Sequence, residues 1–176
     1  MQYGYDRTRK KDLGIKYVLY ALAALLIAFF HVVLSNLIAI GGITPNLMII
    51  LVVWITLKRG QFVGLFAGFL GGMIYDIVTM DVIGTNALSQ TVMAFLTGFF
   101  YREGKEEHTV KSMKFLGILF LACMVHNLIY YFFYIKLSDL SFWNFFFKYG
   151  IAGSLYTTVI GIFAMFIKIP GRQIKI

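Results

Sequence analysis

The sequence is poor in the residues that a water-soluble protein needs. Only 14% of its 176 residues are charged and eight are acidic, whereas a soluble domain carries about 25% charged residues. It has one cysteine, Cys123, which excludes a disulfide within the chain and is expected to be a small buried hydrophobic side chain. With 60% hydrophobic residues and a mean hydropathy of +0.80, the chain is expected to fold in a membrane.

Catalytic and metal-binding signatures are also missing from the sequence. It contains no G-x-S-x-G nucleophile elbow, no H-E-x-x-H zinc motif, no P-loop and no C-x-x-C pair. His31 and His126 lie in apolar blocks, but no second histidine or cysteine stands at metal-ligand spacing, so hydrogen bonds between helices explain them better. We therefore predict no catalytic site, no cofactor, no metal and no enzymatic activity.

Long apolar blocks separated by short charged stretches are what the sequence does contain. We predict one all-α integral membrane domain over residues 1–176. The first block is too long for the apolar core of a signal peptide, and the second would cover only about 20 Å, which requires a locally thinned bilayer or a helix that re-enters from one side. The six predicted spans are residues 17–40, 45–57, 61–79, 86–101, 115–135 and 149–167.

The basic residues favour six crossings with both termini in the cytoplasm. The net charge of +8 comes from Lys and Arg that mostly flank apolar blocks, a pattern typical of orientation signals and contact with anionic lipid rather than nucleic acid. Six spans leave Lys136 and Lys148 outside and 14 basic residues inside, whereas a second block that did not cross would give seven inside and nine outside. Thr44 is a candidate N-cap with Pro45 as first helical residue, and the aromatic run 141–147 is predicted to be interfacial.

Glycines recur at every fourth position in the third block. Gly60, Gly64, Gly68 and Gly72, with Gly71 beside them, form a ridge along one helix face on which another backbone can approach closely. Internal helix packing is the first interpretation, and a surface for another membrane protein is the second.

A polar group follows this ridge. Asp76 is the only acidic residue inside an apolar block, and it lies near Asp81, Gly84 and Asn86. A carboxylate inside a membrane segment is a candidate functional site, but this position is close to the predicted outer boundary. We expect these four residues to shape the outer turn between the third and fourth spans, with substrate, ion or partner binding as the alternative.

Several of these features occur together in the order typical of one protein family. The stretches Thr44 to Leu51, Lys58 to Gly60, Gly64 to Asp76 and Gly84 to Leu88 resemble the rod shape-determining protein MreD family, with a proline-led helix, a basic turn and a glycine-rich helix that ends in aspartate. Asn46 departs from the pattern, because many relatives have aspartate after the proline.

The resemblance implies a non-enzymatic assembly subunit of the bacterial cell-elongation complex in the inner membrane. The implied partners are MreC, the glycosyltransferase RodA, a class B penicillin-binding transpeptidase and the MreB filament, and the glycine ridge is a candidate surface for the MreC helix. The implied fold resembles the substrate-binding subunits of energy-coupling-factor vitamin transporters. That transport function is therefore the alternative, with Ala24 and Ala28 as a small-residue face for a coupling partner.

Overall fold

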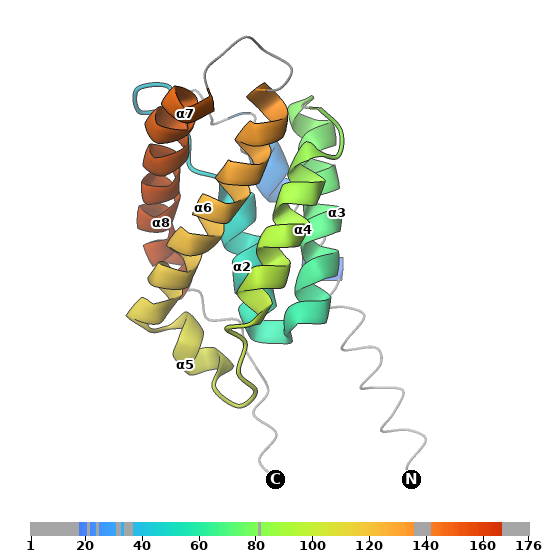
Figure 1. Cartoon of the computed structure of the whole chain (residues 1–176). Coiled ribbons are helices and arrows are strands. Elements are labelled where there is room, and N and C mark those ends of the chain that lie inside the picture. Colours follow the sequence, from blue (N-terminus) through green and yellow to red (C-terminus); the bar gives the residue numbers. More distant parts are fainter. Residues whose placement is uncertain are drawn as a thin grey trace, which may run out of the picture.

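The computed structural model describes residues 18–20, 22–23, 25–30, 33, 37–80, 82–135 and 142–166, and this part of the chain is helical apart from short connections (Figure 1). The first predicted span is described only in part, and its residues between Val18 and Phe30 are helical where described. His31, Asp81 and Lys136 lie outside the described residues, so the predictions for them are not addressed by the structure. The same holds for the side of the membrane on which the two termini lie.

Five helices of the described part lie side by side, namely α2 (Leu47–Arg59), α3 (Gln61–Thr79), α4 (Thr85–Gly98), α6 (Met113–Ile135) and α8 (Ala152–Met165), and the short α2 contacts each of the other four. Three helical stretches of the described part are long and apolar enough to cross a membrane, namely 61–79, 113–134 and 142–165. At about 1.5 Å per residue, α2 and α4 are each only about 20 Å long, so the count of six crossings stays a prediction. The remaining described elements are α5 (Glu106–Val110), α7 (Phe142–Phe145) and the π-helix η1 (Phe146–Ile151).

Helix α2 forms the centre of the core because it is apolar on all sides. Nine of its 13 residues are buried. The prediction that Thr44 caps this helix is wrong, because residues 44–46 are not yet helical and the side-chain oxygen of Asn46 accepts from the N–H groups of Met48 and Ile49 at 3.1 and 3.2 Å. An amide oxygen caps a helix as a carboxylate does. Asn46 therefore has the capping role that an aspartate would have at this position.

The glycine ridge of α3 packs inside the chain. A Cβ atom at Gly68 would lie 2.6 Å from the carbonyl oxygen of Gln90 on α4, and one at Gly72 would lie 2.7 Å from the carbonyl carbon of Asn86. Gly64 meets the side chain of Thr56 on α2 in the same way. These distances are too short for any side chain, so glycine is what allows α3 to contact α4 and α2 this closely.

The other two glycines of the predicted set have different surroundings. At Gly71 the nearest atom to an added Cβ would be the sulfur of Met48 at 3.4 Å, and at Gly60 it would be a ring carbon of Tyr101 at 3.5 Å. Gly60 instead has a φ of 91° in the turn between α2 and α3, a conformation that favours glycine. All five glycines therefore serve packing or turning within the chain.

The last span begins earlier than predicted. The aromatic run expected to be a separate interfacial segment is helical from Phe142 and continues through η1 into α8 as one stretch that ends at Met165. Aromatic side chains of this stretch also pack against α6. The rings of Phe145 and Tyr131 meet edge to face, with their centres 5.2 Å apart. Hydropathy cannot distinguish a helix that lies in the interface from one that extends into it, since both bury aromatic rings.

Candidate functional site

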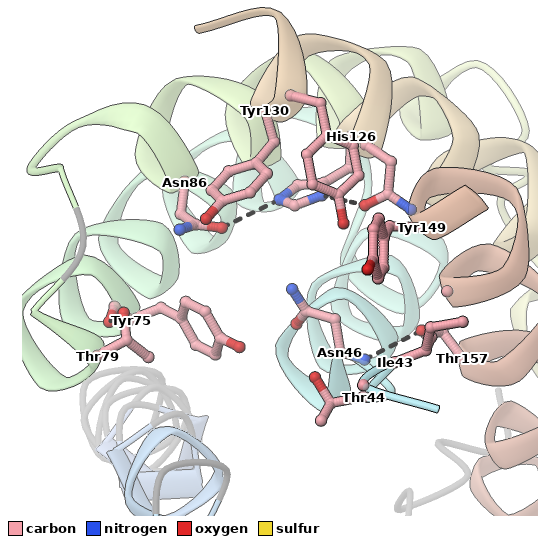
Figure 2. A pocket seen from close by; sticks show the side chains of 14 residues that line it. Ile43, Thr44, Asn46, Tyr75, Thr79, Asn86, His126, Tyr130, Tyr149 and Thr157 are labelled. Carbon is pink, nitrogen blue, oxygen red and sulfur yellow. Dashed lines mark hydrogen bonds between the residues drawn. The ribbon is translucent and has the colours of Figure 1, made fainter. Parts of the chain in front are cut away.

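A polar cavity lies at the end of the bundle where α2 begins. Helix α2 is shorter than α3 and α6, so the space beyond its N-terminus is not filled by helix. The cavity measures about 240 Å³, and Figure 2 shows side chains from several helices directed into it. It is lined by Gly42, Ile43, Thr44, Asn46, Tyr75, Thr79, Asn86, His126, Asn127, Tyr130, Tyr131, Tyr149, Gly153 and Thr157.

Asp76 lies behind the cavity wall and organises the turn between α3 and α4. It is fully buried, and its two carboxylate oxygens accept from the N–H groups of Gly84, Asn86 and Ala87 and from the Asn86 side chain, at 2.9 to 3.2 Å. Gly84 at the start of α4 has no side chain to cap the helix. Asp76 supplies the missing cap, and its negative charge suits a helix N-terminus.

Hydrogen bonds continue from this turn across the bundle. Asn86 donates to Asp76, which directs its amide oxygen toward Nε2 of His126 at 3.2 Å (Figure 2). The other ring nitrogen of His126 lies 3.2 Å from the amide oxygen of Asn127, and the Asn127 amide donates to the Gly150 carbonyl and to Ser154 at 2.9 and 3.0 Å. The network therefore links α3, α4, α6, η1 and α8 through buried and partly buried polar groups, which holds the cavity wall in one arrangement.

The opposite wall is made by the segment before α2 and by α8. The backbone N–H of Asn46 donates to Oγ1 of Thr157 at 3.0 Å, which ties this segment to α8. Residues 40–43 form a tight turn with two backbone hydrogen bonds between Ile40 and Ile43, and its central glycines both have positive φ, as a hairpin turn of this type requires. The turn places residues 42–46 at the cavity.

The cavity offers hydroxyl, amide and imidazole groups together with the rings of four tyrosines, and none of its lining residues is an acid, a lysine or an arginine. Such a lining suits an uncharged polar group, because aromatic rings supply contact area and amides supply directed hydrogen bonds. Among the described residues no group of three or more His, Cys, Asp and Glu could hold a metal ion.

The structure brings together three of the four residues of the predicted outer-turn site, namely Asp76, Gly84 and Asn86, but only Asn86 lines the cavity. Sequence reasoning missed the cavity tyrosines and Thr157. Tyr130 and Tyr131 stand in an apolar run, where aromatic residues are expected to face lipid or core, so no local pattern distinguishes them. The shortness of the second span was the available signal, because a short central helix leaves space beyond its end.

The end of α2, the short helix α5 with its flanking connections and the start of α6 lie at the other end of the bundle (Figure 1). We call it the basic end because these segments carry Lys58, Arg59, Arg102, Lys105, Lys111 and Lys114. Lys58 forms an ion pair with Glu107 of α5, and Lys111 forms a second one with the same carboxylate at 3.0 Å. Hydrogen bonds from these two ammonium groups hold the pKa of Glu107 below its usual value. Lys148 is in η1, directly before the cavity residue Tyr149, so the positive-inside rule predicts that the basic end faces the cytoplasm.

Comparison with known protein families identifies the family of this chain. The profile of the family described as rod shape-determining protein MreD matches residues 11–169, which is most of the chain. Neither the curated proteins nor the solved structures gave a significant match, so the predicted likeness to vitamin-transporter subunits stays a prediction. The chain belongs to the MreD family of rod shape-determining proteins, which makes it a membrane protein with a role in cell shape.

Proposed function

We propose that this chain is a non-enzymatic scaffold subunit of the bacterial cell-elongation complex, embedded by several spans in the cytoplasmic membrane, and that MreC is its direct partner. Family membership supports the role in rod-shape determination. The polar cavity is the observation that carries the partner-binding part of the proposal. It opens at the end of the bundle opposite the basic end, and therefore on the outer side if the basic end is cytoplasmic.

The cavity suits a segment of polypeptide better than a charged substrate. Each residue of a peptide offers one backbone donor and one acceptor, and the uncharged lining provides matching amides and hydroxyls, among them the side chains of Asn127 and Thr157. The residues of MreC next to its transmembrane helix would lie at the depth of the cavity when that helix packs beside the bundle.

The helix of MreC needs an apolar face, and the glycine ridge is already covered by α4 and α2. On the same helix α3, the side chains of Phe62, Phe66, Phe69 and Leu70 are at least half exposed, so they meet lipid or a partner helix. We infer that the ridge contributes indirectly, by holding α3 and α4 so that this face and the cavity keep their shape. RodA and the transpeptidase would occupy other helix faces, and the MreB filament would approach the basic end.

Filling the cavity tests the proposal. A side chain can begin at Gly153 without a clash, because its Cβ would lie 3.8 Å from Ile43 and 3.9 Å from Asn127, so Gly153→Leu would place apolar bulk in the cavity. Gly117→Leu is the matched control, since a Cβ at Gly117 on α6 meets nothing within 4 Å.

We expect Gly153→Leu to reduce recovery of MreC in a mild-detergent pull-down about tenfold and to impair rod shape, while Gly117→Leu behaves as wild type. Unfolding curves of both purified variants show whether each is folded. Undiminished MreC recovery with folded Gly153→Leu would contradict the cavity as the binding site.

A second candidate is the substrate-binding subunit of an energy-coupling-factor-type vitamin transporter, and the cavity is the observation that favours it. Most of its polar groups come from helices, and those of Thr44 and Asn46 come from the segment before α2. A volume of about 240 Å³ is just below the usual range of roughly 300–1,000 Å³ for small-molecule sites. Of the predicted small-residue face, Ala28 is fully buried within the chain and Ala24 lies outside the described residues. Saturable vitamin binding by the purified protein, with recovery of an ATPase pair, would establish this function instead.

A further inference from the structure

A second cavity, lined mainly by aliphatic and aromatic side chains, lies between the N-terminal helical residues, α2 and α8. It has a volume of about 630 Å³, within the range of roughly 300–1,000 Å³ that is typical of ligand sites. We call it the apolar groove. It is lined by Leu19, Tyr20, Ala23, Ile27, Leu47, Ile50, Leu51, Trp54, Ile160, Phe163 and Ala164.

The groove covers about two thirds of the depth of one membrane leaflet, which is half of the hydrocarbon core. Along α2 it extends from Leu47 to Trp54, which corresponds to about 10 Å at 1.5 Å per residue, or about a third of a hydrocarbon core of about 30 Å. Trp54 is on the last turns of α2, near the basic end, and the groove therefore begins close to the cytoplasmic boundary.

A cation stands where the groove meets the basic end. Nε of Arg59 donates to the hydroxyl of Tyr20 at 3.2 Å, and the guanidinium lies 5.8 Å from the centre of the Tyr20 ring. Tyr20 also lines the groove, so this side chain holds Arg59 at its mouth. The neighbouring Lys58 is occupied by Glu107, whereas no carboxylate of the described residues forms an ion pair with Arg59.

We propose that the apolar groove binds an acyl chain of an anionic phospholipid of the cytoplasmic leaflet, with the lipid phosphate on Arg59. The lining is apolar along its length and its open end carries a positive charge, which matches the two parts of such a lipid. The guanidinium has further N–H donors in a planar fork that suits phosphate oxygens. Anionic lipids are the lipids that basic residues at the cytoplasmic boundary attract.

A partner helix fits the groove less well. Helices approach each other closely in membranes where small residues line the contact, but the groove wall has two alanines among mostly large side chains. A flexible acyl chain can adapt to such an uneven surface, whereas a helix about 10 Å wide cannot.

Native mass spectrometry of the full chain, titrated with phosphatidylglycerol or with phosphatidylethanolamine of the same acyl chains, tests the proposal. We expect tighter binding of phosphatidylglycerol and about a fivefold loss of that binding in Arg59→Gln, since one basic residue near the surface contributes about that factor. Lys114→Gln removes an equal charge from an exposed residue of the basic end and is expected to change binding little. Ala23→Phe, which fills the groove, should weaken both lipids, while Leu22→Phe on the exposed side of the same segment should not.

Cross-linking on the wild-type chain gives a readout that does not depend on any variant being folded. Phosphatidylglycerol with a diazirine in its acyl chain should label groove residues such as Ile50 and Leu51 in excess over the exposed Phe62 of α3. Even labelling of both faces, or Arg59→Gln and Lys114→Gln variants that bind phosphatidylglycerol equally, would overturn the proposal. If MreC rather than lipid protected the groove residues from labelling, that result would also overturn the proposal.

Discussion

Replacing Gly68 by alanine tests whether the closeness of α3 and α4 depends on the absence of a side chain. The new Cβ would lie 2.6 Å from the carbonyl oxygen and 2.9 Å from the carbonyl carbon of Gln90, and 3.2 Å from the Cβ of Ala94. Two of these three atoms belong to the backbone of α4, so no change of rotamer relieves the contact. The two helices have to move apart.

The size of the effect follows from two opposing terms. Overpacking of this kind costs about 1–3 kcal/mol, while alanine in place of glycine inside a helix gains up to about 1 kcal/mol. In Gly117→Ala on α6 only the gain from alanine inside a helix applies, because nothing lies within 4 Å of the added Cβ. The difference in unfolding free energy between the two variants therefore isolates the clash, and we expect Gly68→Ala to be less stable by about 1–3 kcal/mol.

Equilibrium unfolding in mixed detergent micelles, followed by tryptophan fluorescence, measures this difference. Trp54 lies in the core of the bundle, so its emission should report separation of the helices. Equal unfolding free energies for Gly68→Ala and Gly117→Ala would refute the reasoning, because a backbone contact at 2.6 Å cannot then be present in the folded protein.

Three further predictions concern polar groups. Asp76→Asn keeps the shape but replaces a carboxylate oxygen that accepts hydrogen bonds by an NH₂ group that cannot, so unfolding experiments should show a loss of about 3 kcal/mol. Gln90→Met should stabilise the protein by about 1–3 kcal/mol in the same assay, because both polar atoms of the buried Gln90 amide lack a partner among the described residues; a less stable variant would reveal a partner for that amide. Because the pKa of Glu107 is lowered, its ion pairs with Lys58 and Lys111 contribute above the unfolded-state pKa and are lost as pH falls through the lower folded-state pKa. A comparison of wild type with Glu107→Gln between pH 7 and pH 3 should therefore show a difference below about 1 kcal/mol that vanishes in acid.

Much of the fold could be predicted from patterns with a direct local cause. The bounds of α3 and α6 follow closely the apolar blocks predicted at 61–79 and 115–135, because a span needs about 20 apolar residues wherever it stands. The turn at Gly60 was visible as a glycine after two basic residues. The helix cap was misassigned to Thr44, since both Thr44 and Asn46 are good capping residues and only the backbone path decides between them.

The candidate site was less predictable, because its parts come from segments far apart in the sequence. Asn46 and Thr157 are 111 positions apart and share a hydrogen bond, and His126 reaches Asn86 across 40 positions. Each of these residues, considered alone, has an ordinary structural explanation. Their shared function as a cavity lining depends on which helix faces meet, and hydropathy does not encode that.

The class of the protein and much of its helical framework follow from the amino-acid sequence alone. Low charge, long apolar blocks and glycines at every fourth position act through the cost of polar groups in hydrocarbon and through local helix geometry, so they can be read without coordinates. Three features became visible only in the folded chain: the glycine ridge is covered by neighbouring helices, Asp76 caps α4, and the short α2 leaves a polar cavity at one end. These features depend on distances between separate helices, and such distances are set by the packing of the whole bundle.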